Sequence, residues 1–233
     1  MINEDPKKGM NIRINKKGDI LIKIIYWGCA GSGKTTAVDT LFKLVNDGDF
    51  NIKIIQSLKK IDMKSGSTLY FDRGVFQSKI QEKIFYNVYT VAGQVRFSPL
   101  RERIFNGTNA IIFVFDGQRS RLSENIDSLK ELKKISGNRL ISDIPLLIMV
   151  NKQDLPNVMD KSEIKDFLES EKLFDFNDKW SPIVYETIAL HKNSQNIYTI
   201  FSELLRRIAQ YIQKDRKDLD KNPPNLPKDV PEL

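Results

Sequence analysis

Cysteine and histidine are nearly absent from this sequence, with one residue of each among 233. The single cysteine, Cys29, excludes a disulfide framework within the chain and any cysteine-based zinc site. Such a chain suits a reducing compartment, so we expect a cytoplasmic location. The only histidine, His191, falls in a predicted loop, and we expect no catalytic role for it.

Long apolar runs are also missing. No stretch approaches the roughly 20 residues that a helix needs to cross a bilayer, and neither a signal peptide nor a lipidation motif is visible. The net charge is +7, and its clearest cluster comprises Lys7, Lys8, Arg13, Lys16 and Lys17. We interpret this cluster as a solvated basic face, with an acidic partner or a peripheral membrane contact as the alternatives. Aromatic residues do not interleave with it, which argues against nucleic acid as a ligand.

A glycine-rich stretch, Gly28-Cys-Ala-Gly-Ser-Gly-Lys-Thr35, has the spacing of the phosphate-binding loop. An apolar run at 20–27 precedes it like a buried strand, and an amphipathic run at 36–45 follows it. The glycines let successive backbone N–H groups point at an anion, and the start of the next helix adds a positive dipole end. We expect Lys34 to reach the β- and γ-phosphates and the Thr35 hydroxyl to ligate Mg²⁺.

The predicted phosphate-binding residues are Gly28, Cys29, Ala30, Gly31, Ser32, Gly33, Lys34, Thr35 and Thr36. Cys29 is interpreted as a small filler residue of the loop, with redox sensitivity as the less favoured alternative.

Apolar runs of strand length are frequent. The uninterrupted runs at 110–115 and 146–150 are typical of strands covered on both faces. Helical spacing of apolar residues occurs between such runs, most clearly from Ile197 to Ile212. Strand and helix alternate, so we predict an α/β fold of the P-loop NTPase class, with a doubly wound, mostly parallel sheet and helices on both faces.

Weaker patterns complete the predicted organisation. A short hairpin is expected from 11–14 and 19–24, and strands at 52–55, 68–71 and 84–91, with a polar mobile loop at 57–67. The expected domain boundaries are an N-terminal extension at 1–18, a nucleotide-binding domain at 19–213 and a disordered tail, rich in proline and charge, at 214–233.

A second motif, Asn151-Lys-Gln-Asp154, directly follows the strand predicted at 146–150. The Asp154 carboxylate can accept hydrogen bonds from guanine N1–H and the exocyclic amine of guanine, whereas adenine lacks both donors. Asn151 can tie this segment to the phosphate-binding loop, and the aliphatic stem of Lys152 can lie along the base. The two motifs together predict GTP or GDP as the ligand, with Mg²⁺ as the metal.

A third segment, Thr90-Val-Ala-Gly93-Gln94, follows the strand predicted at 84–91. Gly93 lets a backbone N–H group approach the γ-phosphate, and Gln94 is placed to orient the attacking water, as glutamine does in Ras and Gα. Thr68 is predicted to contact Mg²⁺ and the γ-phosphate when GTP is bound. The alternatives are a turn with an exposed Gln94 and an ordinary strand threonine at 68. The predicted catalytic residues are Gln94, Lys34 and Thr68, and the predicted metal ligands are Thr35 and Thr68.

These motifs resemble those of Ras-like small GTPases, and most specifically the bacterial and archaeal MglA type, named for mutual gliding motility. Thr68-Leu-Tyr-Phe-Asp72 resembles the Thr-Leu-Phe-Phe-Asp of that group, and Tyr89-Thr-Val-Ala-Gly-Gln-Val95 resembles its Tyr-Thr-Val-Pro-Gly-Gln-Val. The resemblance covers residues 19–212. It implies a GTP-hydrolysing switch, an activating partner of the roadblock type, and a role in polarity or trafficking. It also implies that the Ala189 backbone N–H faces guanine O6.

Two departures from the family pattern bear on the chemistry. Most Ras-like proteins carry aspartate at the position of Thr90, so Mg²⁺ must rely here on Thr35 and the phosphates. The MglA type carries arginine before the switch threonine, where this chain has Ser67. An arginine finger contributes about 10³ to 10⁵ in rate, so we expect slow hydrolysis unless a partner reshapes the site or Arg73 or Arg96 enters it. The simpler interpretation of both arginines is a surface ion pair or free solvation.

Three other functions are compatible with parts of the sequence. The chain can be a guanine-nucleotide-dependent docking module that does not hydrolyse GTP, or a regulatory subunit of a membrane-associated complex. An ATP-using P-loop kinase or ATPase is the third alternative, and the segment 151–154 argues against it. We expect a monomer, and the sequence does not identify its effectors.

Overall fold

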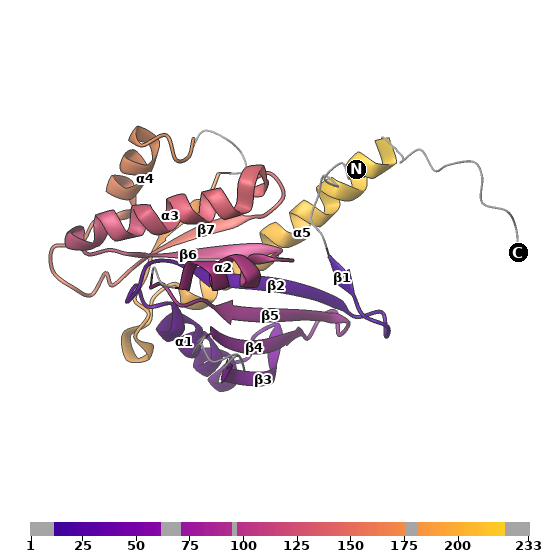
Figure 1. Ribbon diagram of the computed structural model, residues 1–233. Helices are drawn as coiled ribbons and strands as arrows, with labels where there is room; N and C mark the ends of the chain where they lie inside the picture. Colours follow the sequence, from indigo (N-terminus) through magenta and orange to yellow (C-terminus); the bar gives the residue numbers. More distant parts are fainter. Residues whose placement is uncertain (1–11, 62–70, 95–96, 176–180, 222–233) are drawn as a thin grey trace, which may run out of the picture.

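The computed structural model describes residues 12–61, 71–94, 97–175 and 181–221. One sheet of eight strands crosses this part of the chain, with helices on both of its faces (Figure 1). The strands are β1 (Arg13–Ile14), β2 (Ile20–Trp27), β3 (Ile52–Ile61), β4 (Phe71–Ser78), β5 (Ile84–Thr90), β6 (Ala110–Asp116), β7 (Leu146–Asn151) and β8 (Ile183–Glu186). The helices of more than one turn are α1 (Lys34–Asp47), α2 (Ser98–Phe105), α3 (Leu122–Ser136), α4 (Lys161–Ser170) and α5 (Ile197–Lys221).

The strand order is β3-β4-β5-β2-β6-β7-β8, and β1 pairs with β2. The central pairs β5–β2, β2–β6, β6–β7 and β7–β8 are parallel, whereas β3–β4, β4–β5 and β1–β2 are antiparallel. This arrangement confirms the predicted doubly wound, mostly parallel sheet. Because parallel strands end at the same edge, the segments that follow β2, β5, β6 and β7 meet there.

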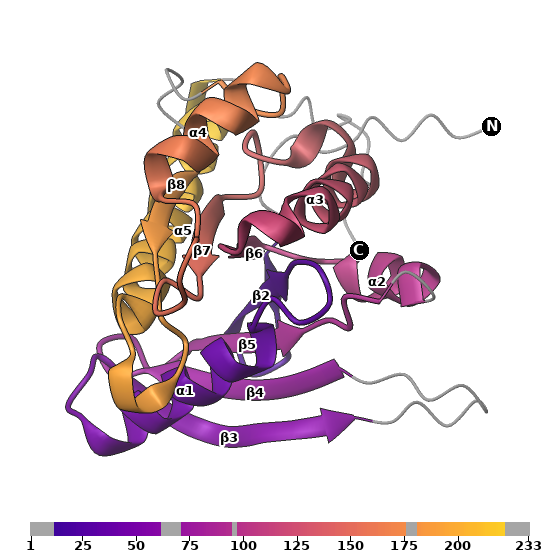
Figure 2. The ribbon, with the colours of Figure 1, turned by 90° about the vertical axis from the view of Figure 1, so that its left-hand side faces the viewer.

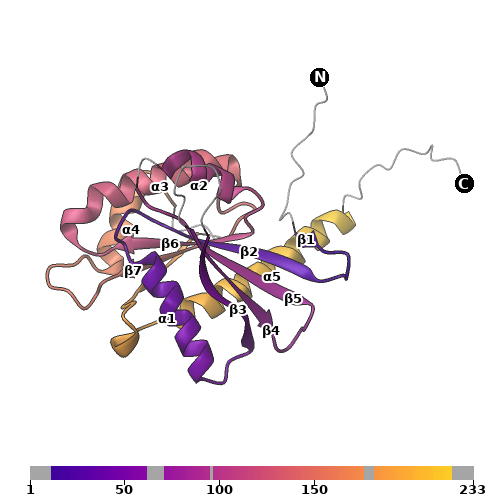
Figure 3. The ribbon, with the colours of Figure 1, turned by 60° about the horizontal axis from the view of Figure 1, so that its bottom comes forward.

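Two hydrophobic layers explain why the central strands are apolar throughout. In β6, Ile112 and Val114 pack with α1 and α5, whereas Ile111, Phe113 and Phe115 pack with α2, α3 and α4. Successive strand residues point to opposite faces, so a strand covered on both sides needs apolar residues at every position. Figure 3 shows α1 and α5 on one side of the sheet and α2 and α3 on the other.

The two strands at one edge of the sheet differ from the prediction. β3 continues to Ile61, so the predicted loop at 57–67 begins with strand residues. β4 runs over Phe71–Ser78 and so extends beyond the predicted strand at 68–71. Leu58 packs on the same hydrophobic layer as Ile54, which explains why the polar stretch between them remains extended. The predicted residues 68–70 lie outside the described part of the chain.

Both ends of the described chain can also be compared with the sequence. The predicted hairpin is confirmed, because Arg13 pairs with Leu21 and Ile14 with Ile20. Helix α5 runs through Lys221, into the segment where the sequence predicts a disordered tail from residue 214 (Figure 1). Residues 214–221 contain neither proline nor glycine, so nothing in them interrupts helical hydrogen bonding. No helix among the described residues combines the length and apolar character that a membrane crossing requires.

Candidate nucleotide-binding site

The glycine-rich loop connects β2 to α1 at the edge where the parallel strands end (Figure 2). A cavity of about 500 Å³ lies between this loop, the start of α1 and the segment that leaves β5. Its lining residues are Ala30, Gly31, Gly33, Lys34, Thr35, Thr36, Val91, Ala92, Gly93, Gln94 and Phe97. Ligands of open α/β sheets bind at this kind of position.

Two glycines of the loop occupy conformations that a side chain cannot share. Gly28 has a φ of 148°, and an added Cβ would lie 2.2 Å from the Val114 carbonyl oxygen. Gly33 has a φ of 99°, and its Cβ would lie 2.2 Å from the Nδ2 atom of Asn151. Gly33 is also the N-terminal cap of α1, where no side chain accepts from the first N–H groups of the helix. These N–H groups are therefore available to an anion such as phosphate.

Lys34 lies across the inside of this loop. Its ammonium donates to the carbonyl oxygens of Gly28, at 2.9 Å, and Cys29, at 2.6 Å, and the residue is 7% exposed. Burial lowers the pKa of Lys34 to about 8. A phosphate beside this ammonium would favour its charged form again, so anion binding and protonation of Lys34 support each other.

Asn151 joins the second sequence motif to the glycine-rich loop, as the sequence predicts. Its Nδ2 atom donates to the Ser32 carbonyl oxygen at 2.8 Å, across 119 residues of sequence. Its Oδ1 atom accepts from the backbone N–H of Ala189 at 3.0 Å and from the Thr187 hydroxyl at 3.4 Å. The Ala189 N–H, which the resemblance places at guanine O6, is thus bonded to Asn151 in this structure.

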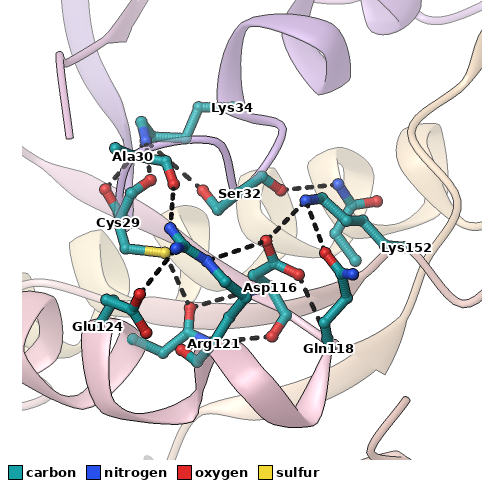
Figure 4. Close-up of polar contacts among 12 residues, drawn as sticks. Cys29, Ala30, Ser32, Lys34, Asp116, Gln118, Arg121, Glu124 and Lys152 are labelled. Carbon is teal, nitrogen blue, oxygen red and sulfur yellow. Dashed lines mark hydrogen bonds and ion pairs between the residues drawn. The ribbon is translucent and has the colours of Figure 1, made fainter. Parts of the chain in front are cut away.

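The remaining residues of that motif lie beside this connection. Lys152 donates to Oδ2 of the buried Asp116 at 2.6 Å and to the Gln118 side chain at 3.3 Å (Figure 4). Its ammonium is thereby fixed, and its stem is available to lie along a base. Asp154 is exposed, so its carboxylate is accessible to a ligand.

Two residues near the start of α3, Arg121 and Asn125, contact the glycine-rich loop, and no role was predicted for them from the sequence; Arg121 is labelled in Figure 4. Arg121 donates to the Ala30 carbonyl oxygen at 2.9 Å. Asn125 accepts from the Cys29 thiol at 3.3 Å and also bonds both backbone groups of Asp116. No motif marks these residues, and their position after β6 is the only signal in the sequence.

Cys29 fills space under the loop, as the sequence analysis favoured. Its side chain is buried, and burial raises the pKa of its thiol, an effect that Lys34 and Arg121 only partly offset. A thiol held in its protonated form reacts slowly, because the thiolate is the nucleophile.

Asp72, at the start of β4, approaches the loop from the other side. Its Oδ2 atom accepts from the Thr35 hydroxyl and from the Thr90 hydroxyl, both at 2.9 Å. Asp72 ends the segment 68–72 that resembles the MglA type, and no function was predicted for its side chain. The predicted metal ligand Thr35 therefore contacts a carboxylate that the sequence did not identify.

The segment after β5 packs against the glycine-rich loop. A Cβ added to Gly93 would lie 2.4 Å from the backbone nitrogen of Ala30, so only glycine permits this approach. Arg101, on α2, donates to the carbonyl oxygens of Ala92 and Gln94, at 2.8 and 2.7 Å, and pairs with Glu131 at 2.7 Å. The Gln94 side chain is exposed at the cavity.

Other predicted residues fall outside this arrangement. Thr68, Ser67 and Arg96 lie outside the described part of the chain. Arg73 bonds the Asn87 side chain at 2.8 Å, on the face of the sheet opposite to its neighbour Asp72. His191 lies 4.0 Å from an Asp47 carboxylate oxygen and takes no part in the site.

Thr36 is exposed at the start of α1 and lines the cavity. Within the described ranges there is no group of three histidine, cysteine, aspartate or glutamate residues that is arranged to hold a metal ion.

Comparisons with known proteins agree with this geometry. The sequence profile of Arf, the ADP-ribosylation factor family, matches residues 11–212, which include the glycine-rich loop and the segment 151–154. The mutual gliding-motility protein MglA of Myxococcus xanthus (strain DK1622) is 28% identical over 162 residues. That alignment covers 68% of this chain and 80% of the relative.

Proposed function

This chain belongs to the ADP-ribosylation factor family and is a small GTPase, and we propose that it is a switch that binds GTP and hydrolyses it slowly to GDP and phosphate. The hydrogen bond from Asn151 to the Ser32 carbonyl oxygen carries this proposal. It supports the proposal because it joins the segment proposed to select the base to the loop proposed to hold the phosphates. A nucleotide that spans the two segments contacts both.

The proposed nucleotide contacts follow from the positions of the side chains. Lys34 and the N–H groups at the start of α1 hold the phosphates, because this end of the helix lacks a side-chain cap. Asp154 accepts from the guanine N1–H and amine, while the stem of Lys152 lies along the base. An adenine in the same place leaves the carboxylate unpaired, which is the basis for selecting guanine.

The residues around Thr35 fit Mg²⁺. Its hydroxyl lies beside the buried Asp72 carboxylate, and oxygen donors of this kind are those that Mg²⁺ prefers. When bound, Mg²⁺ would neutralise negative charge on the phosphates. We propose that Thr35 and Thr68 are the protein ligands.

The proposed catalytic residue is Gln94, which orients the attacking water from the mouth of the cavity. Slow turnover is proposed because no arginine among the described residues of the cavity is available for the γ-phosphate. Arg101 is engaged by Glu131 and two carbonyl oxygens, and Arg73 points to the other face of the sheet. We expect a rate between about 10⁻⁴ s⁻¹, as in unaided Ras, and 10⁻² s⁻¹, as in Gα with its own arginine.

The proposed switch consists of residues 57–68 and 93–105, which contact the γ-phosphate only while it is present. Gly93 already lies against the glycine-rich loop, so a γ-phosphate entering there changes its surroundings directly. By resemblance, the proposal includes an activating partner of the roadblock type and a role in polarity or trafficking. The low cysteine content is the ground for the proposed cytoplasmic location. The proposal also includes a monomeric state.

Single-turnover phosphate release from the GTP-loaded chain tests hydrolysis. We expect a rate of 10⁻⁴ to 10⁻² s⁻¹ for the natural chain and a rate at least about tenfold lower for Gln94→Leu, with GTP binding unchanged. Gln210→Leu, an exposed glutamine on α5, is the matched control and should leave the rate unchanged. A rate well above 10⁻² s⁻¹ without a partner contradicts slow turnover. Binding without any phosphate release favours the non-hydrolysing docking module instead.

A further inference from the structure

The position of Asp72 in the sheet directs its side chain toward the start of α1. Arg73 pairs with Tyr89 in the antiparallel β4–β5 register, so Asp72 lies opposite Thr90 and on the same face of the sheet. The Asp72 backbone N–H also donates to the Thr90 hydroxyl oxygen, at 3.3 Å. Asp72 and Thr90 therefore hold each other in place beside Thr35.

The Asp72 carboxylate is buried beside the start of α1, where it is 7% exposed. Two hydroxyl donors share its Oδ2 atom. The ion pairs among the described side chains, which do not include that of Lys60, its partner in the β3–β4 register, leave Asp72 out. A cation bound next to a buried carboxylate offsets the cost of burying its charge.

The hydrogen bond from the Thr35 hydroxyl to Asp72 also determines the side on which the lone pairs of this hydroxyl are available to a metal ion. A hydroxyl has one proton to donate and two lone pairs to offer. Because the Thr35 proton is directed at Asp72, the lone pairs remain available on the side away from the carboxylate. Groups that hold a metal ligand in this way orient it and increase its basicity.

We propose that Asp72 supplies the Mg²⁺ site with the carboxylate that most Ras-like proteins carry at the position of Thr90. In most Ras-like proteins the carboxylate lies at the end of the strand that corresponds to β5. In this chain it lies at the facing position on β4, where the Thr90 hydroxyl donates a hydrogen bond to it. Asp72 is a positioning residue, since it acts on the metal through the Thr35 hydroxyl. This inference rests on the proposed function, because it requires that a guanine nucleotide and Mg²⁺ bind at the glycine-rich loop.

The test is the affinity of the GDP-loaded chain for Mg²⁺, measured by calorimetric titration with the metal alone. Asp72→Asn keeps the shape and removes the charge, and we expect Mg²⁺ binding to weaken about 10- to 100-fold. Adding Thr90→Asp to this variant returns a carboxylate to the facing strand and should restore most of the affinity. Asp49→Asn, which alters an exposed carboxylate that pairs with Lys79, is the control and should leave Mg²⁺ affinity unchanged.

Two further measurements separate a metal role from a structural one. Thermal unfolding in EDTA should show Asp72→Asn at least as stable as the natural chain, because a buried charge has been removed. Thr90→Val removes only the hydroxyl that holds Asp72 and should weaken Mg²⁺ binding about 2- to 10-fold. This variant provides the test if Asp72→Asn does not fold.

The outcomes are distinct from those that test the proposed function. The inference about Asp72 is wrong if GDP binds and Asp72→Asn holds Mg²⁺ at least as tightly as the natural chain does. If Asp72→Asn does not fold, the same comparison is made with Thr90→Val. Tighter binding by Asp72→Asn means that the carboxylate competes with the metal for Thr35. If the natural chain binds no GDP in either Mg²⁺ or EDTA, the proposed function itself fails.

Discussion

Replacement of Asn151 by alanine is expected to destabilise the fold and loosen the glycine-rich loop. The side chain is 2% exposed and bonds two backbone groups, the Ser32 carbonyl and the Ala189 N–H. Ser32 and Ala189 are themselves buried, so both groups lose their partner in an environment that excludes water.

The magnitude follows from the cost of leaving such groups unpaired. Each costs about 1 to 3 kcal/mol, so the two together give about 2 to 6 kcal/mol. A water molecule that enters the space left by the side chain can bond one of them, so we expect the lower half of this range, about 2 to 4 kcal/mol. The Thr187 hydroxyl, at 3.4 Å, is a weak third partner and adds little.

The assay is urea unfolding of the nucleotide-free chain, followed by circular dichroism, with the midpoint and slope compared between variants. Asn46→Ala, an exposed asparagine in α1, is the matched control and should change the free energy of unfolding by less than about 0.5 kcal/mol. A loss below about 0.5 kcal/mol for Asn151→Ala, with an unchanged slope, would mean that these two hydrogen bonds do not stabilise the loop.

Three other predictions concern the ligand and the segment after β5. Asp154→Ala should weaken GDP binding about 10- to 150-fold and leave ADP binding unchanged, as competition with a fluorescent nucleotide would show. Because the pKa of Lys34 is about 8 and only the protonated form holds phosphate, GDP affinity should fall about fourfold between pH 7 and 8.5. Constant GDP affinity across that range would contradict this. Arg101→Gln should lower the free energy of unfolding by about 3 kcal/mol. This is the low end of the range for breaking a buried ion pair, because the partner Glu131 is 20% exposed. Unfolding at the temperature of the natural chain would mean that the pair contributes nothing.

The parts of the site that could be predicted are formed by residues that lie close together in the sequence. The glycine-rich loop is defined by its own spacing, and its position between β2 and α1 follows from the apolar runs beside it. The contact from Asn151 to the loop was predictable because its motif directly follows a buried strand. In each case one short segment contains both the chemistry and its structural context.

Residues that depend on how distant elements pack could not be predicted. Asp72 reaches Thr35 only through the antiparallel register of β4 against β5, and no spacing in the sequence gives that register. Arg121 reaches the Ala30 carbonyl oxygen because α3 begins beside the loop, which is a property of the whole fold.

The errors in the secondary structure have a similar cause. The stretch around Gln56 is polar and looks like a loop in isolation, but pairing with β4 and the packing of Leu58 extend it as a strand. Tertiary contacts thus decide the state of segments whose local preference is weak.

Calorimetric titration of the nucleotide-free chain with GDP and with ADP, each with Mg²⁺, measures whether the site selects guanine. We expect GDP to bind at least about 100-fold more tightly than ADP, because adenine leaves the Asp154 carboxylate without its two donors. Equal affinities for the two nucleotides, or no heat from either, would contradict this prediction.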